Sequence, residues 1–394
     1  MTTRIASGSE ETDEEFRRRL VTFLTDRHPG PAPKDPQDRL AWVKGWLATM
    51  YDEGFAGPSW PRELGGMDLP FNKQVVYQEE IARSKVPTFI GTGLAIAGPT
   101  IIKYGSEEQK QQLLPPLLRG DSLWVQGYSE PDAGSDLPSL RTTARREGDE
   151  YVVCGQKIWT TMAQGADIVF TLVRTGTQES RQHGISYLLI DAHQPGVTIQ
   201  PIRDMAGGRQ FSQVTFEDAR APVSNRIGEE NGGWPLVRTS LGHERAAGAM
   251  NQAAMYRRVV NELIELAHER GATDDQSVRD ALADFEMRVR IMRYSAMRVI
   301  NDIIASGEPG ASASTTRLFN TMFEQDLHEF AVDMLGTHGV VRPGGPSSIQ
   351  RGRWTRGFLS TRASTIGAGT AEIQRNTVAE KVLGLPYDPS MPTT

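Results

Sequence analysis

Apolar side chains in the first third of the chain recur at the spacing of an amphipathic helix. Phe16, Leu20, Phe23 and Leu24 lie at positions i, i+4, i+7 and i+8, which places them on one helical stripe. The segment 40–50 repeats this spacing, and three prolines between residues 29 and 33 interrupt the helical pattern. The pattern predicts an all-helical region over residues 1–123.

From residue 124 to residue 234 the apolar period changes to two. Runs of β-branched and aromatic residues occur at 151–155, 168–173, 185–190 and 213–216, with turn residues between them. Closely spaced strands without an intervening helix favour an antiparallel sandwich or barrel over a parallel sheet.

The helical period returns over residues 235–394. Val260, Leu263, Ile264 and Ala267 share one helical face, and a second apolar face extends over residues 319–334. Long amphipathic helices joined by short loops are typical of a helical bundle. We therefore predict an α+β protein with an all-α domain at 1–123, a middle β domain at 124–234 and an α-helical bundle at 235–394.

Length and composition narrow the class of protein. The 394 residues exceed the roughly 250–300 at which a single hydrophobic core stops growing. A net charge of −6 leaves no basic footprint for nucleic acid. The single cysteine, Cys154, and the scattered histidines predict neither a disulfide framework nor a metal site. A polar N-terminus and the lack of a long apolar run predict a cytoplasmic protein without a membrane span.

Two segments of the middle region carry side chains that suit a ligand. Segment 128–137 (YSEPDAGSDL) can offer the hydroxyls of Ser129 and Ser135 to an anion such as a pyrophosphate, but its composition also fits an ordinary surface loop. Segment 155–161 (GQKIWTT) ends a predicted strand. Trp159 could cover a flat aromatic ligand and Thr161 could hydrogen-bond a ring heteroatom, although a tryptophan here is also typical of a sandwich core.

Two segments of the C-terminal region are further candidates, and one glycine-rich segment is not. Glu244 in 241–245 (LGHER) could be a general base if burial raises its pKa, or could belong to a solvated helix face. Segment 366–376 joins a glycine-rich turn to a helix start, where free N–H groups suit an oxyanion, or where Thr370 simply caps the helix. Segment 91–98 has the glycines of a dinucleotide loop but follows no predicted strand, so we expect close helix packing there.

In their order and context these segments resemble the acyl-CoA dehydrogenase family of flavoproteins over essentially the whole chain. The strongest matches are 128–137, 148–161 and 367–376. The resemblance implies an N-terminal helical domain, a middle antiparallel β domain and a C-terminal four-helix bundle, with FAD between the last two. Family members are usually tetramers in which a neighbouring subunit helps to hold the adenine half of FAD.

The resemblance also implies roles for individual residues. The implied cofactor-binding positions are Gln126, Tyr128, Ser129, Ser135, Trp159, Thr161, Arg270, Thr370 and Glu372. Trp159 would pack on the isoalloxazine, and Thr161 would hydrogen-bond near its N5. Thr370 and Glu372 belong to the ribityl–pyrophosphate side. Ser135 and Arg245 are the expected substrate contacts.

One departure from the family pattern concerns the base. Many members have a Glu immediately before the Gly-Thr of the C-terminal motif, and here that position is Ala368, which cannot accept a proton. Other members place the base in a Leu-x-x-Glu-Arg pattern on the first long C-terminal helix, and Glu244 fits that pattern. The resemblance therefore implies Glu244 as the base, while Ala368 keeps its backbone N–H for the thioester oxygen.

A second departure concerns the cofactor arm. The family's Arg-x-x-Phe-Gly motif is not intact after Arg270, and Asp333 stands where a Gln is usual. These changes resemble a subgroup that acts on bulky, often steroid-derived CoA thioesters and pairs with a second, FAD-sharing subunit. A homotetramer, a homodimer and a heterotetramer all remain open.

The resemblance thus implies FAD-dependent α,β-dehydrogenation of an acyl-CoA to the trans-2-enoyl-CoA. Glu244 would remove the α-proton, flavin N5 would take the hydride and an electron-transfer flavoprotein would be the electron acceptor. Two alternatives remain: a non-catalytic or FAD-sharing subunit of a heteromeric dehydrogenase, and a flavin-dependent oxygenase on the same fold.

Overall fold

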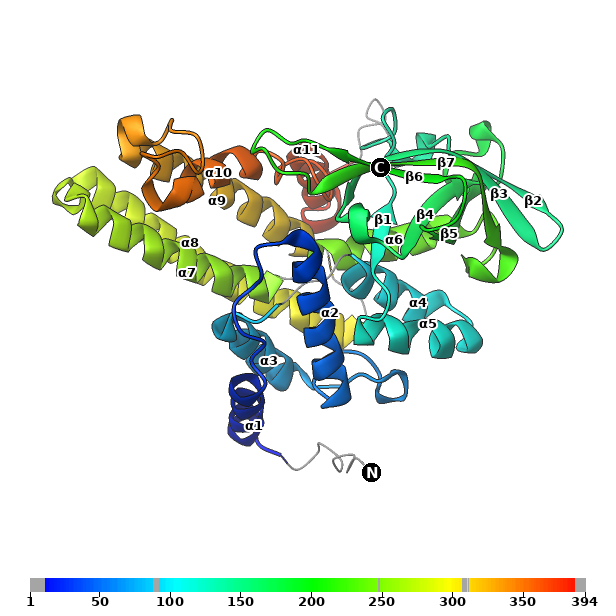
Figure 1. The fold of residues 1–394 in the computed structure, drawn as a ribbon, viewed down its shortest axis with the longest axis horizontal. Coiled ribbons are helices and arrows are strands. Elements are labelled where there is room, and N and C mark those ends of the chain that lie inside the picture. The colour runs from blue at the N-terminus through cyan, green and yellow to red at the C-terminus, as the bar shows by residue number, and fades with distance from the viewer. Residues whose placement is uncertain (1–10, 88–91, 247–248, 307–309, 311, 387–394) are drawn as a thin grey trace. The chain divides into compact units, whose positions relative to one another are not determined.

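The computed structural model in Figure 1 describes residues 11–87, 92–246, 249–306, 310 and 312–386. The side chains of residues 36–37, 245–246 and 249–251 lie outside this description. The chain divides into two compact units, Met1–Trp124 and Val125–Thr394.

The N-terminal unit is helical, as the sequence predicts. Its helices are α1 (Asp13–Asp26), α2 (Pro36–Asp52), α3 (Phe71–Ser84), α4 (Gly98–Tyr104) and α5 (Glu107–Arg119). The predicted stripe of α1 is buried in full, and α1 packs against α3. A capping box between Thr12 and Glu15 satisfies free N–H groups at the start of α1, and Ser106 and Gln109 do the same for α5.

The glycines of segment 92–98 allow close packing, which confirms the sequence prediction for the part that the structure describes. A Cβ atom on Gly93 would lie 2.7 Å from Cβ of Trp124, and one on Gly98 would lie 2.1 Å from the Trp60 ring. Both glycines therefore allow close contact with a tryptophan residue, and Gly91 lies outside the described residues.

The second unit begins with a sheet. Its strands are β1 (Trp124–Gly127), β2 (Thr143–Glu147), β3 (Glu150–Thr161), β4 (Ile168–Arg174), β5 (Ile185–Asp191), β6 (Val197–Ile202), β7 (Phe211–Pro222) and β8 (Arg226–Ile227). They follow the order β6-β7-β3-β2-β4-β5-β8, and β1 pairs with β4. The neighbours are antiparallel as predicted, except that β2 meets β4 in parallel at Thr143 and Arg174.

Burial explains which strands the sequence reveals. β4 and β5 are buried on both faces and are almost wholly apolar, so they stand out in the sequence. β2 is largely exposed and polar, and β6 is short, contains Pro201 and has no fully buried residue; sequence analysis missed both strands.

The C-terminal helices follow the sheet. They are α6 (Gly233–Ala246), α7 (Ala249–Glu269), α8 (Gln276–Ser306), α9 (Ser312–Leu335), α10 (Arg353–Thr361) and α11 (Ala371–Thr377). The long helices α7 and α8 form an antiparallel hairpin in Figure 1, and α9 packs against α6, α8, α10 and α11.

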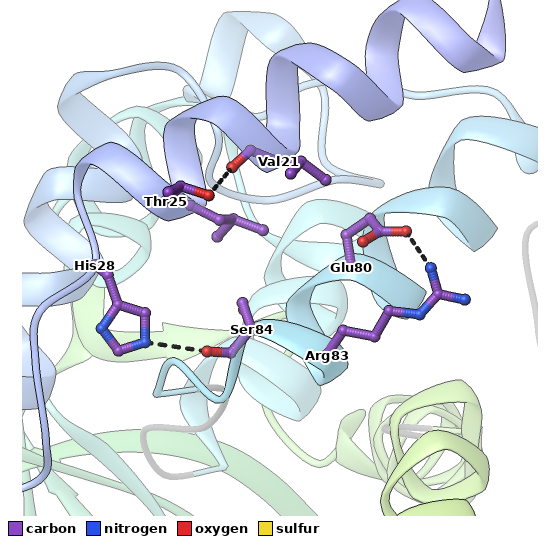
Figure 2. Close-up of a pocket in the computed structure, with 7 residues that line it drawn as sticks. Val21, Thr25, His28, Glu80, Arg83 and Ser84 are labelled. Carbon is purple, nitrogen blue, oxygen red and sulfur yellow. Dashed lines mark hydrogen bonds and ion pairs between the residues drawn. The ribbon is translucent and has the colours of Figure 1, made fainter.

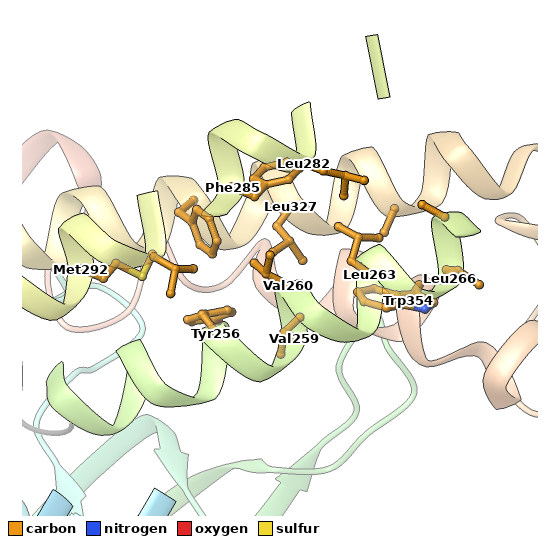
Figure 3. Packing of buried hydrophobic residues seen from close by; sticks show 14 of the residues in the cluster. Tyr256, Val259, Val260, Leu263, Leu266, Leu282, Phe285, Met292, Leu327 and Trp354 are labelled. Atoms are coloured by element: carbon orange, nitrogen blue, oxygen red, sulfur yellow. The ribbon is translucent and has the colours of Figure 1, made fainter. Parts of the chain in front are cut away.

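An apolar core joins α7, α8 and α9. In Figure 3, Val260 and Leu263 of α7 lie close to Phe285 of α8 and Leu327 of α9, and these residues are buried together with Trp354 of α10. The predicted apolar faces of α7 and α9 are thus confirmed, but Met322 of α9 is exposed because it lies off the stripe that contains its neighbour Phe323. No helix of the described residues is long and apolar enough to cross a membrane.

Candidate active site

The carboxylate of Glu244 is held by an amide from the sheet. Glu244 lies near the end of α6, which packs against β5 and α9, and its side chain is half-buried. Nε2 of Gln126, in β1, donates to Oε2 of Glu244 over 3.4 Å. Helix α6 and strand β1 therefore bring two predicted site residues together across more than a hundred residues of sequence.

Tyr128 lies behind this pair, in the core of the sheet. Its ring is buried and meets Phe170 and Tyr187 edge-on, with centroids 5.9 and 6.3 Å away. Burial raises the pKa of the Tyr128 hydroxyl, and the negative charge of Glu244 adds to the shift. The Tyr128 side chain thus has a packing role, and any contribution to a cofactor site would be indirect.

The loop after β1 lies against β3. The Ile158 N–H donates to the Ser129 carbonyl over 2.9 Å, and Glu130 and Ala133 form a small bridge within the loop. Ser129 is half-buried and Ser135 is exposed. Among the described residues, neither hydroxyl has a hydrogen-bond partner, so both remain available to a ligand.

A buried ion pair that sequence analysis missed fixes this loop. Lys157 of β3 is fully buried, and its Nζ donates to Oε1 of Glu130 over 2.7 Å and to the Tyr128 carbonyl over 3.1 Å. Glu130 also accepts the N–H groups of Arg141 and Thr142, at 2.7 and 2.9 Å. Sequence alone gave no signal, because two charged residues 27 positions apart show no periodic relation.

The two members of this pair respond differently to burial. Burial alone would raise the pKa of Glu130, but the charge of Lys157 and the hydrogen bonds from Lys157, Arg141 and Thr142 outweigh burial and lower that pKa. Burial lowers the pKa of Lys157, and the Glu130 carboxylate opposes that shift. The carboxylate is the better satisfied partner, because the ammonium uses only two of its three N–H groups here.

Trp159 is exposed at a distorted point of β3. The register between β3 and β7 shifts between Lys157 and Thr160, and Trp159 has a φ of +62°. The indole is 57% exposed and touches Phe211 only edge-on, with centroids 6.1 Å apart. A non-glycine residue in this conformation costs about 1–3 kcal/mol, and such strain is typical of functional sites. The core alternative for Trp159 is therefore wrong.

Thr161 ends β3 opposite Phe211 and is half-buried. Within the described part of the chain its hydroxyl has no hydrogen-bond partner. An uncovered indole face with a free hydroxyl two residues away suits a flat heteroaromatic ring that accepts or donates hydrogen bonds.

The turn at 366–370 is held from α11. Ala368 has a φ of +56° and Gly369 a φ of +91°. Nε2 of Gln374, which is 2% exposed, donates to the Ala368 carbonyl over 3.1 Å, and a Cβ atom on Gly369 would lie 2.4 Å from that nitrogen. The Thr370 hydroxyl caps α11 by accepting the Ile373 N–H. The Ala368 N–H has no acceptor among the described residues.

The remaining predicted site residues whose side chains are described are exposed. Glu372 is exposed and pairs with Arg375 one turn later. Arg270 is exposed in the turn between α7 and α8, at the end of the hairpin that is remote from the sheet in Figure 1. Asp333 is exposed on α9. The Arg245 side chain lies outside the described residues.

The N-terminal unit has a hollow of its own, about 400 Å³ in volume. It is lined by Val21, Leu24, Thr25, His28, Glu80, Arg83 and Ser84. Figure 2 shows that polar groups of its lining bond to one another: a ring nitrogen of His28 contacts the Ser84 carbonyl, and Arg83 donates to Glu80. The hollow contains no predicted site residue. In the described parts of the chain, no cluster of acidic, histidine or cysteine side chains could hold a metal ion.

Comparison with known proteins gives a consistent classification. Family models match three consecutive parts: "Acyl-CoA dehydrogenase, N-terminal domain" at 10–121, "middle domain" at 126–219 and "C-terminal domain" at 231–383. The acyl-CoA dehydrogenase IpdE1 of Mycobacterium tuberculosis is 36% identical over 384 residues, which cover 95% of this chain and 98% of the relative.

Solved structures agree with the family models. A chain of the ChsE4-ChsE5 complex from Mycobacterium tuberculosis matches with a TM-score of 0.80 at 33% identity, covering 98% of this chain and 100% of that one. A chain of the Tcur3481-Tcur3483 steroid ACAD also has a TM-score of 0.80, at 30% identity, with 98% and 100% covered.

The chain belongs to the acyl-CoA dehydrogenase family. It is accordingly a flavoprotein oxidoreductase that dehydrogenates an acyl-CoA, and its cofactor is FAD. The sequence predictions of family, fold and cofactor are thus confirmed. The residues present fit FAD. The Trp159 indole is exposed, and the hydroxyls of Ser129, Ser135 and Thr161 have no hydrogen-bond partner among the described residues.

The Glu130–Lys157 pair generates a stability prediction. Replacing Glu130→Gln leaves a buried ammonium without its counter-charge, so the free energy of unfolding at pH 7 should fall by about 3–5 kcal/mol. The double variant Glu130→Gln/Lys157→Met should recover most of this loss, because it removes the buried charge. Urea denaturation followed by tryptophan fluorescence measures both effects.

A matched control variant and the direction of the pH dependence of stability make this test more specific. Glu147→Gln removes the exposed partner of Arg145 and should cost less than about 1 kcal/mol. Folding lowers the pKa of Glu130. The contribution of Glu130 to stability is therefore fully present above its pKa in the unfolded state, and it is lost as the pH falls through its pKa in the folded state. The difference between parent and Glu130→Gln should therefore shrink in acid. Equal losses for Glu130→Gln and Glu147→Gln at pH 7 would contradict the assignment.

Proposed function

We propose that Glu244 is the base that removes the α-proton of the acyl-CoA. The observation that carries the proposal is the Glu244 carboxylate itself, half-buried and held by Gln126 beside the buried Tyr128 ring. Ala368 supports it, because the position where many family members have a Glu offers no proton acceptor here. A chain that dehydrogenates acyl-CoA needs a base elsewhere, and Glu244 meets that need.

We propose that FAD lies against the exposed end of β3. The Trp159 indole would cover the isoalloxazine and Thr161 would hydrogen-bond near N5, since both side chains are uncommitted among the described residues. Ser129 and Ser135 would meet the flavin and pyrophosphate, with Gln126 in β1 and Tyr128 directly after that strand. Thr370 and Glu372 would face the ribityl–pyrophosphate side.

In this proposal the chain's own groups govern the proton. Glu244 takes the proton from the α-carbon while the N–H of Ala368 donates to the thioester oxygen, where negative charge develops as the C–H bond breaks. Bound FAD would supply the acceptor for the hydride that leaves the β-carbon. The electron pair of the α C–H bond then forms the carbon–carbon double bond, and the pair of the β C–H bond reduces the cofactor. Gln126 orients the Glu244 carboxylate by its amide hydrogen bond. Ser135 and Arg245 are the proposed substrate contacts.

Replacing Glu244→Gln should leave FAD bound and slow cofactor reduction by acyl-CoA by about 10²–10⁴-fold, because an amide cannot accept the proton. The measurement is the anaerobic loss of flavin absorbance after mixing with substrate. Glu265→Gln, an exposed carboxylate on α7, is the matched control and should react like the parent. Reduction of Glu244→Gln at the parent rate would refute the assignment.

Replacing Trp159→Ala should weaken FAD binding, because the isoalloxazine loses its aromatic cover. Equilibrium dialysis of the apoprotein against FAD measures the dissociation constant, which should rise about tenfold, as expected for loss of an aromatic contact worth roughly 1–1.5 kcal/mol. Trp234→Phe is the control. It replaces a tryptophan of the same unit but keeps an aromatic ring at that position, so the dissociation constant should stay at the parent value. An unchanged dissociation constant for Trp159→Ala would place the cofactor elsewhere.

We propose that the chain assembles with a second acyl-CoA dehydrogenase-like subunit. The exposed Arg270, remote from the sheet, and the exposed Asp333 in place of the usual Gln support an FAD arm that this chain does not complete alone. The similar solved structures are themselves named as two-component proteins. A homotetramer is the competing assembly, and an electron-transfer flavoprotein is the proposed electron acceptor.

Purification alone and after coexpression with a candidate second subunit tests the assembly. The proposal predicts full FAD content and an α₂β₂ mass only in the coexpressed complex. A panel of straight-chain, branched and polycyclic acyl-CoAs, tested on that complex, then defines the substrate. Full FAD content in a homotetramer would contradict it. Loss of activity in the complex on Glu244→Gln would exclude the non-catalytic alternative, and anaerobic reduction by acyl-CoA would exclude an oxygenase.

A further inference from the structure

One arginine of α9, Arg317, contacts the turn at 366–370. Nη2 of Arg317 donates to the Gly367 carbonyl over 2.9 Å and to the Ser364 carbonyl over 3.1 Å. Nε of Arg317 is buried and has no acceptor among the described residues. The Gly367 and Ser364 carbonyls are therefore the acceptors that the structure gives this guanidinium.

The Gly367 carbonyl and the Ala368 N–H belong to the same peptide unit. In a planar trans peptide the C=O and N–H point in opposite directions, so a donor fixed on the oxygen also fixes where the N–H points. The Gln374 amide fixes the next peptide unit through the Ala368 carbonyl. Ala368 thus lies between two peptide planes that are each held by a side chain, one of them cationic.

A charged donor on the oxygen also changes the chemistry of the N–H. A guanidinium hydrogen bond is stronger than a neutral one, and bonds in a chain polarise each other. The guanidinium draws electron density toward the Gly367 oxygen and makes the Ala368 N–H a stronger donor. The benefit grows when the acceptor carries negative charge, as the oxygen of an enolate does.

We propose that Arg317 is a positioning residue that aims and polarises the Ala368 N–H toward the enolate oxygen of the bound thioester. This inference deepens the proposed function and rests on it. Arg317 does not touch the substrate; it acts through one peptide bond. It strengthens binding of the enolate and leaves binding of the neutral thioester nearly unchanged.

A 3-ketoacyl-CoA tests the proposal without turnover, because it already carries its oxygen at the β-carbon and can ionise to an enolate in place. The pH at which the bound ligand ionises is followed by enolate absorbance in the FAD-loaded protein. In Arg317→Met this apparent pKa should rise by about one unit, a tenfold weaker preference for the enolate. Arg317→Lys keeps the positive charge but carries its donors on a single nitrogen, and its apparent pKa should lie between those of Arg317→Met and the parent.

Arg362→Met is the matched control. Arg362 also donates to a backbone carbonyl near the turn, that of Phe358, and pairs with Glu329, but it does not contact the Gly367–Ala368 peptide. The ligand pKa should stay at the parent value in this variant. The dissociation constant of a saturated acyl-CoA analogue should be similar in all four proteins.

Three results would overturn the proposal. The ligand pKa could stay at the parent value in Arg317→Met while thermal stability falls, which would make Arg317 a holder of the turn only. Arg362→Met could raise the pKa equally, which would indicate a general field effect. The Lys variant could behave like the Met variant. Should Arg317→Met fail to fold, Arg317→Gln, which keeps a neutral donor, replaces it with the same expected direction.

Failure of the proposed function is recognised separately. Anaerobic reduction of the parent by acyl-CoA and its loss in Glu244→Gln test the base, and neither depends on Arg317. A parent that is reduced normally but shows no Arg317 effect on the ligand pKa refutes only the positioning role.

Discussion

A buried ion pair joins the two segments on which the proposed cofactor site is built. Lys157 lies two residues before Trp159 in β3, and Glu130 directly follows Ser129 in the loop after β1. A fully buried ammonium cannot leave its carboxylate without a large desolvation penalty, so the pair sets the position of this loop against β3. The indole and the serine hydroxyl consequently belong to one rigid frame, although the loop itself is rich in turns. A site that must hold a flat cofactor benefits from such support behind its contacts.

The chemistry imposes a second constraint, because an α-carbon acid needs both a base and donors for the enolate oxygen. Many family members place the carboxylate and the N–H in the same C-terminal turn. In the proposed mechanism this turn keeps only the N–H of Ala368, and the carboxylate is that of Glu244 in α6. Helix α9 packs against both α6 and α11 and also carries Arg317, so one helix supports the two separated functions. The division leaves a methyl group where a carboxylate would otherwise occupy space, which is compatible with a larger acyl group.

Much of the fold could be predicted from the sequence, because periodicity reports burial. The stripe of Phe16 and Leu20, the apolar strands β4 and β5 and the faces of α7 and α9 are all buried as expected. Exposed strands such as β2 escaped, since a short run of polar residues resembles a loop. The Glu130–Lys157 pair and the positive φ of Trp159 escaped for a different reason: both depend on tertiary contacts, which leave no local pattern. The family resemblance supplied Gln126 and Glu244 as separate site residues, but the contact between them also escaped.

The central claim is that Glu244 faces the α-carbon of the substrate. The most direct test is a crystal structure of the FAD-loaded protein with a saturated acyl-CoA analogue that cannot be oxidised. The account predicts a Glu244 carboxylate oxygen about 3–3.5 Å from the analogue's α-carbon, with the Ala368 N–H on the thioester oxygen. A Glu244 side chain turned away from the ligand, with another carboxylate at the α-carbon, would contradict it.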